Sequence, residues 1–198
     1  MRTIGFFRLA GLMLAALMAT TPRPVVAADE IFADSFEPPF NVPASDAEAA
    51  RFLNQATFGA TAADIASLRS GGIFTWMNNQ MAAPATLSRV WMEAYAAALT
   101  TGSVSQDDRL HRWFNTAVTA PDQLRQRVAW ALSQIIVASD RDGSLSGEVI
   151  MMTEWNDLLV RNALGNYRTL LQEVTYSPMM ARYLTYLRNR KFELNRSG

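Results

Sequence analysis

The chain has 198 residues, of which 49% are hydrophobic and 18% are charged, and its 18 Lys and Arg residues balance its 18 Asp and Glu residues. This composition is typical of a globular protein with a sizeable core and excludes a chain that is disordered throughout. Because Cys is absent, thiol catalysis and thiolate metal sites are excluded.

Residues 1–28 have the pattern of a secretory signal peptide. Arg2 and Arg8 form a basic start, residues 9–19 are an almost unbroken apolar run, and small residues place a cleavage point after Ala27 or Ala28. The apolar run is short for a permanent anchor, although an uncleaved anchor is the alternative. We therefore expect export to the periplasm or the extracellular space, without a stable membrane span after cleavage.

Cleavage would also change the charge balance. It removes three arginines and no acidic residue, which leaves 15 basic residues against 18 acidic ones. A mildly acidic chain has no basic field to attract nucleic acid and no polybasic segment to hold an anionic membrane. We therefore expect no nucleic-acid partner.

A proline-rich leader at residues 29–44 precedes a helical domain at residues 45–198. Apolar spacing and capping residues predict helices over residues 45–59, 61–72 and 87–99, with a short apolar segment over residues 73–81. Further helices are predicted to begin at Ser105, at residue 122, near Ser146 or Gly147, at Tyr167 and at Pro178. No strand is expected. The predicted fold class is all-α, with about eight helices packed orthogonally in a single domain.

Side chains at the helix starts make specific capping predictions. Ser45 with Glu48 predicts a capping box for the first helix. Thr61, Ser105 and Asn166 predict N-caps for three later helices, because their side-chain oxygens can accept hydrogen bonds from free backbone N–H groups.

Residues 155–187 hold three helical segments around which the rest of the chain is expected to pack. Gly165 is predicted to end the first segment with a positive φ, and the Ser177 hydroxyl is predicted to cap the third. The residues expected on the buried faces are Trp155, Leu158, Leu159, Leu170, Leu171, Val174, Met180, Tyr183, Leu184 and Leu187.

Apolar spacing also predicts the buried faces of two earlier helices. The helix that begins at Ser105 should bury Leu110, Trp113, Phe114 and Ala117. The helix over residues 122–139 should bury Leu124, Val128, Ala131, Leu132, Ile135 and Ile136.

Three blocks read Ala-Arg-Phe-Leu-Asn-Gln-Ala-Thr-Phe-Gly-Ala-Thr from Ala50, Leu-Arg-Gln-Arg-Val-Ala-Trp-Ala-Leu-Ser-Gln from Leu124, and Asp-Leu-Leu-Val-Arg-Asn-Ala-Leu-Gly-Asn-Tyr-Arg-Thr-Leu-Leu from Asp157. In this order and spacing, across about residues 48–190, they resemble the N-terminal portion of DUF1800, a bacterial family of unknown function. The resemblance implies a secreted, mainly helical protein whose molecular activity is not established.

Members of that family are usually longer and continue, shortly after the position of Asn189, into a block like Pro-Asp-Glu-Asn-Tyr-Ala-Arg-Glu. This chain instead reads Lys-Phe-Glu-Leu-Asn-Arg-Ser-Gly from Lys191. The resemblance therefore implies a truncated member with an incomplete domain. In that case Tyr183, Leu184 and Leu187 are expected to stay partly uncovered.

Glu154 and Asp157 are the candidate catalytic residues, because residues three apart on a helix can place two carboxylates on one face for acid-base chemistry or a cation site. Asp157 also precedes Arg161 by four residues, so an ion pair is the alternative. His111 is the only histidine, which excludes a His-pair metal motif. We predict no metal site and no cofactor, and whether the chain is an enzyme stays open.

Four arginines are the candidate ligand-binding residues, and they are Arg125, Arg127, Arg161 and Arg168. Arginines on apolar helices either bind an anionic ligand or pair with carboxylates. In the second case Asp122, Asp157 or Glu173 would be the partners.

The favoured function is a binding or structural module of the cell envelope or extracellular space that acts on a protein partner. The alternative is a non-catalytic N-terminal part of a larger secreted hydrolase or metal-dependent enzyme. A third hypothesis, a carbohydrate or polymer binder, requires that Trp76, Trp91 or Trp155 be exposed. The oligomeric state is left open.

Overall fold

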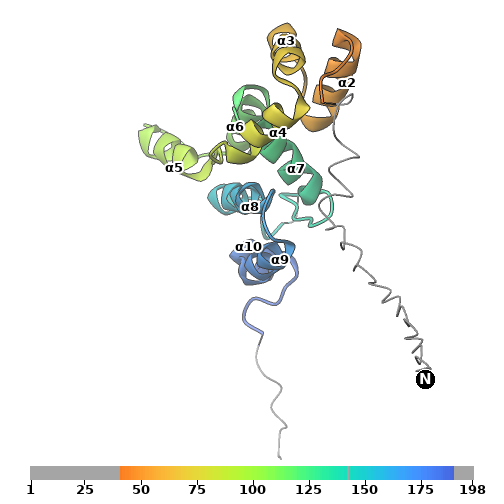
Figure 1. Cartoon of the computed structure of the whole chain (residues 1–198). Coiled ribbons are helices and arrows are strands. Elements are labelled where there is room, and N and C mark those ends of the chain that lie inside the picture. The colour runs from red at the N-terminus through yellow and green to blue at the C-terminus, as the bar shows by residue number, and fades with distance from the viewer. Residues whose placement is uncertain (1–40, 142, 190–198) are drawn as a thin grey trace, which may run out of the picture. The chain divides into compact units, whose positions relative to one another are not determined.

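The computed structural model describes residues 41–141 and 143–189. The predicted signal peptide and most of the leader lie outside these ranges, as do residues 190–198. The helices, labelled in Figure 1, are α2 (Asp46–Ala56), α3 (Ala62–Gly71), α4 (Ile73–Ala82), α5 (Arg89–Ala98), α6 (Gln106–Thr119), α7 (Gln123–Ser133), α8 (Val149–Asn162), α9 (Tyr167–Tyr176) and α10 (Pro178–Tyr183).

Every regular element within the described ranges is a helix, which confirms the all-α class. The orthogonal packing angle stays a prediction. None of the described helices is both long enough and apolar enough to cross a membrane.

Helix α8 runs through the centre of the larger core. It contacts α5, α6, α7, α9 and α10 (Figure 1). Trp155, Leu158 and Leu159 are buried, as their spacing predicts, but so are Asp157 and Asn162. A helix buried on all sides must find partners for its polar side chains inside the protein.

A smaller core joins α2 and α3. Leu53 and Leu68 are fully buried there, and Phe52 packs edge-on against Trp76 of α4 with ring centroids 5.3 Å apart. The two cores are connected because α4 and α2 both contact α7.

Three of the predicted N-caps are confirmed. Thr61 and Ser105 each form a capping box, with Asp64 and Asp108 respectively. Asn166 accepts from two backbone N–H groups of α9. The box predicted for Ser45 forms in part, because the Ser45 hydroxyl accepts from Glu48 N, but the Glu48 carboxylate accepts from Ala44 N at 2.9 Å.

Two helix boundaries differ from the prediction in their chemistry. Gly165 does not adopt a positive φ, since the described glycines that do are Gly59, Gly72 and Gly102. Instead, α8 ends at Asn162, whose carbonyl accepts from Gly165 N at 3.0 Å. The Ser177 hydroxyl makes no capping bond to α10, so the turn relies on Pro178 in its first position.

The predicted buried faces of α6 and α7 are correct only in part. Ala117 of α6 is buried, and Leu132 and Ile136 pack against the larger core. Leu110 and Phe114 of α6 are exposed, whereas Arg109 and Thr116 are buried. Helix α7 ends at Ser133 and leaves Ile135 beyond it 75% exposed. The residues that α7 buries, together with its N-cap, are Asp122, Gln126 and Ala129, which share one face at the spacing i, i+4, i+7.

Candidate functional site

The connector between α4 and α5, residues 83–88, is held by a carboxylate from α8. Asp157 accepts from Ser88 N at 2.9 and 3.0 Å and from Arg89 N at 2.8 Å. Ser88 is the N-cap residue of α5 but gives no side-chain cap. Asp157 therefore supplies, from another helix, the acceptor that free N–H groups at a helix start require.

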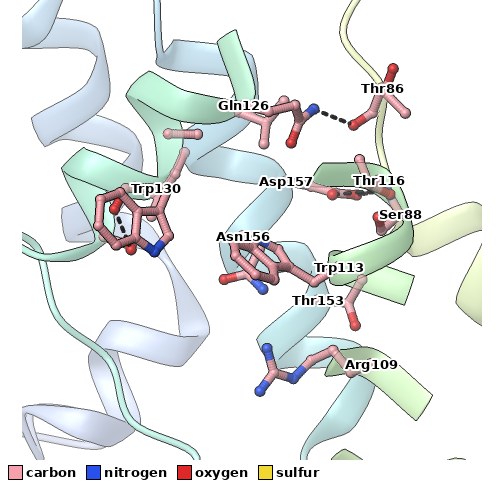
Figure 2. A pocket seen from close by; sticks show the side chains of 14 residues that line it. Thr86, Ser88, Arg109, Trp113, Thr116, Gln126, Trp130, Thr153, Asn156 and Asp157 are labelled. Atoms are coloured by element: carbon pink, nitrogen blue, oxygen red, sulfur yellow. Dashed lines mark hydrogen bonds between the residues drawn. The ribbon is translucent and has the colours of Figure 1, made fainter. Parts of the chain in front are cut away.

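A second buried carboxylate holds the same connector at Thr86, which precedes Ser88. Asp122 accepts from Thr86 N at 2.9 Å and from the Gln126 side-chain amide at 3.0 Å. The same Gln126 amide donates to Thr86 O at 3.0 Å (Figure 2). Arg125 donates to Ala83 O at 3.3 Å and lies 4.0 Å from the Asp122 carboxylate.

The two candidate catalytic carboxylates face different partners. Glu154 accepts from Arg161 at 2.6 Å and lies 3.5 Å from Arg89. Arg161 therefore pairs with Glu154, not with Asp157 as the ion-pair alternative proposed. Burial raises the pKa of the Asp157 carboxyl, while the hydrogen bonds from Arg89 N and Ser88 N lower that pKa to a smaller extent. A catalytic role for Glu154 and Asp157 stays a prediction.

The four candidate arginines have different environments. Arg125 donates to the connector at Ala83 O, and Arg161 pairs with Glu154. Arg168 is exposed on α9 and has no side-chain partner in the described part of the chain, while Glu173 accepts from Asn162. Arg127 lies against aromatic rings, with its Cζ 4.6 Å from the centroid of Trp130 and 5.3 Å from that of Phe58.

These rings belong to a larger group, which we call the aromatic cluster: Phe58, Trp113, Phe114 and Trp130. Phe58 meets Trp113 edge-on at 5.6 Å and Trp130 at 6.4 Å, and Trp113 meets Phe114 at 4.9 Å. Phe114 is 59% exposed and Trp130 is 38% exposed. The cluster thus combines rings fixed by edge-to-face packing with a surface open to solvent.

A small polar cavity lies beneath the cluster. Its volume is about 40 Å³, and Trp113 and Trp130 form part of its wall. Asp157, Ser88, Gln126 and Thr86 also line the cavity, and Figure 2 shows Asp157 pointing toward Ser88 and Gln126 toward Thr86. A polar space of this size suits one or two water molecules.

Arg109 also lines this cavity and was not anticipated from the sequence. It donates to Asp140 at 2.7 Å and to Gln106 at 2.6 Å. Burial lowers the pKa of Arg109, and the Asp140 carboxylate opposes that shift. This partly buried pair holds α6 against the loop before α8.

A larger groove of about 550 Å³ borders the aromatic cluster on another side. Phe58 is shared between the cluster and the groove, and Val118 and Trp76 form further apolar walls of the groove. The polar residues that line the groove are Thr57, Thr61, Asp64, Gln80, Thr119 and Gln123.

The exposure of the three tryptophans named in the carbohydrate hypothesis differs. Trp155 is buried and Trp76 is partly buried, whereas Trp91 is 42% exposed. Trp91 stacks on Tyr95 with an interplanar angle of 9°, and the Cζ atom of Arg112 lies 5.1 Å from the centroid of the Trp91 ring. One of the three residues therefore meets the requirement for an exposed aromatic side chain.

Sequence reasoning missed Phe58, Trp130, Asp122 and Gln126 as site residues. Asp122 and Gln126 are four residues apart beside a proline, but both are polar, so apolar spacing does not mark the face that they share as buried. In the described residues no three His, Cys, Asp or Glu side chains gather as metal ligands would.

We predict that Asp157→Asn destabilises the fold by about 1–3 kcal/mol at pH 7, because the amide group of asparagine faces N–H donors that the carboxylate accepts from. The raised folded-state pKa means that the folded chain binds a proton at a higher pH than the unfolded chain does. The Asp157 contribution to stability therefore grows as pH falls through the window between the two pKa values. Urea unfolding at several pH values between 7 and 4 should show that the free energy of unfolding of the parent chain rises relative to that of the variant as pH falls.

Asp107, an exposed carboxylate in the first turn of α6, provides the control substitution Asp107→Asn. A raised pKa for Asp157 is contradicted if the free energy of unfolding of the parent chain instead falls relative to that of Asp157→Asn as pH falls. Backbone hydrogen bonding would then outweigh burial.

The sequence is similar to a known protein family. The chain matches the DUF1800 family, described as a protein of unknown function, over residues 51–196. No curated protein and no solved structure matches it. The match covers most of the chain and includes the connector, the aromatic cluster and the groove. This protein therefore belongs to the DUF1800 family.

Proposed function

We propose that this chain is an exported helical module that binds a component of the cell envelope or extracellular space through the aromatic cluster. The observation that carries the proposal is the exposure of Phe114 and Trp130 beside an arginine that has no carboxylate partner in the described residues. Large aromatic side chains and arginine are the residues enriched at binding hot spots.

The cluster is also built for recognition rather than for packing alone. Its rings come from α6, α7 and the segment after α2, and each ring is fixed edge-on by a neighbour. Rings that are already ordered lose little conformational entropy when a partner binds. Exposed aromatic surface with this degree of order supports a binding role.

We expect Phe114→Ala to weaken binding to the partner at least about tenfold, because the substitution removes the most exposed ring of the cluster. The measurement is co-sedimentation of the full chain with an insoluble envelope preparation from its host, at several protein concentrations. Tyr176→Ala is the matched control, since Tyr176 is 79% exposed on α9 and lies outside the cluster. Equal loss, or no loss, in both variants contradicts the proposal.

Export is supported by the sequence of residues 1–28 alone. A fusion of the chain to alkaline phosphatase, which needs disulfides formed outside the cytoplasm, should be active. A charged residue in the apolar run, as in Leu14→Arg, should abolish this activity. The mature chain should begin at residue 28 or 29 by mass spectrometry, and an intact N-terminus on exported protein would support the anchor alternative instead.

One observation favours the alternative that the chain is the non-catalytic N-terminal part of a larger secreted enzyme. An apolar hollow of about 460 Å³ is lined by Ile135, Val137, Met180 and Leu184, among others. Ile135, Leu184 and Leu187 are exposed, and Tyr183 is partly buried. An apolar surface of this kind is a typical site for a covering segment.

If this surface lacks its cover, the purified chain should bind a hydrophobic dye, and the double variant Ile135→Ser, Leu184→Ser should bind much less. Both side chains are exposed, so the substitutions should change the free energy of unfolding little. A monomeric chain that melts cooperatively and binds no dye would count against the alternative.

A further inference from the structure

We infer that the partner is an acidic saccharide, whose carboxylate pairs with Arg127 while its ring lies against the aromatic cluster. This inference rests on the proposed binding function of the cluster. It names the ligand class and gives Arg127 the central role.

Arg127 differs from the other described arginines in how it is held. Most of them donate to a carboxylate or carbonyl, as Arg109 does to Asp140 and Arg161 to Glu154. Among the described arginines without such an acceptor, Arg127 alone is partly buried, and the exposed ones are Arg51, Arg141, Arg168 and Arg188.

The two rings beside Arg127 prepare its guanidinium for an anion. The guanidinium lies over both Trp130 and Phe58, and these cation–π contacts hold its position without using its N–H donors. A planar fork held in this way matches the two oxygens of a carboxylate better than a flexible lysine would. The charge that completes the site is therefore negative.

The adjoining groove indicates a hydroxylated ligand. Phe58 belongs to both the groove and the cluster, and Trp76 adds a second aromatic wall. Thr57, Thr61 and Thr119 also line the groove, but their hydroxyls already donate to Leu53 O, Asp64 and Asn115 O. The groups left for a ligand are ring faces and side-chain oxygens, which suit a sugar with C–H faces and hydroxyl edges better than an apolar peptide side chain.

Two acceptors in the groove remain for sugar hydroxyls. The Gln123 amide nitrogen donates to Ala117 O and Ala120 O, which leaves its side-chain oxygen facing no described donor. Asp64 uses one carboxylate oxygen in the cap of α3. Because Asp64 would repel a second carboxylate, the groove favours a neutral ring next to the acidic ring that Arg127 binds.

The test compares two probes on the full chain. The first is a tetrasaccharide in which glucuronate alternates with N-acetylglucosamine, and the second is the same tetrasaccharide with its carboxylates reduced to alcohols. We expect the acidic probe to bind at least about tenfold more tightly, as measured by calorimetry at low salt.

Three variants locate the effect. Arg127→Gln should reduce the affinity for the acidic probe to that of the reduced probe and leave the reduced probe unaffected. Arg127→Lys should recover only part of the affinity, because it keeps the charge but loses the planar fork. Arg168→Gln removes an equal charge from an exposed site on α9 and should change neither affinity.

Equal binding of the two probes, equal loss in Arg127→Gln and Arg168→Gln, or no binding of either probe overturns the inference. So does tighter binding of an acidic peptide of matched charge, which would identify a protein as the partner. The proposed function is judged separately, because co-sedimentation that depends on Phe114 would persist in each of these cases if the cluster binds another ligand.

Discussion

Two buried carboxylates, Asp122 and Asp157, hold the connector that joins α4 to α5. Together they accept from the backbone N–H groups of Thr86, Ser88 and Arg89. A buried N–H group without an acceptor costs about 1–3 kcal/mol, so this short segment could not lie between α7 and α8 if both positions were apolar. The connector leads directly into α5, which contacts α8.

The same constraint determines which residues α7 presents to the surface. Asp122, Gln126 and Ala129 are turned inward. Arg127 and Trp130, each one residue further along and three apart, therefore share the neighbouring face of the helix. There they meet Phe58, which follows α2. The exposed cluster is thus a consequence of the buried polar face, not an independent feature of the surface.

Hydrogen bonds between residues within one helical turn were predictable from the sequence, and contacts between residues far apart in the sequence were not. The caps at Thr61, Ser105 and Asn166 were confirmed because a capping bond depends on residues within one turn. The buried faces of α6 and α7 were predicted only in part, because apolar spacing cannot count a buried Gln126 or Arg109, whose partners lie 40 and 31 residues away. For the same reason the sequence could name Arg127 as a candidate but could not supply its stacking partner Phe58.

The small cavity links the buried polar face to the cluster in a way that bears on any binding experiment. Trp113 and Trp130 line it from the cluster side, and Asp157 and Gln126 line it from the connector side. A substitution at Asp157 can therefore shift the two tryptophan rings without contacting a ligand. Such a variant should weaken acidic and reduced saccharides alike, since it disturbs the ring surface they share. Loss of Arg127 should affect only the acidic one, and this difference separates a residue that positions the cluster from one that binds.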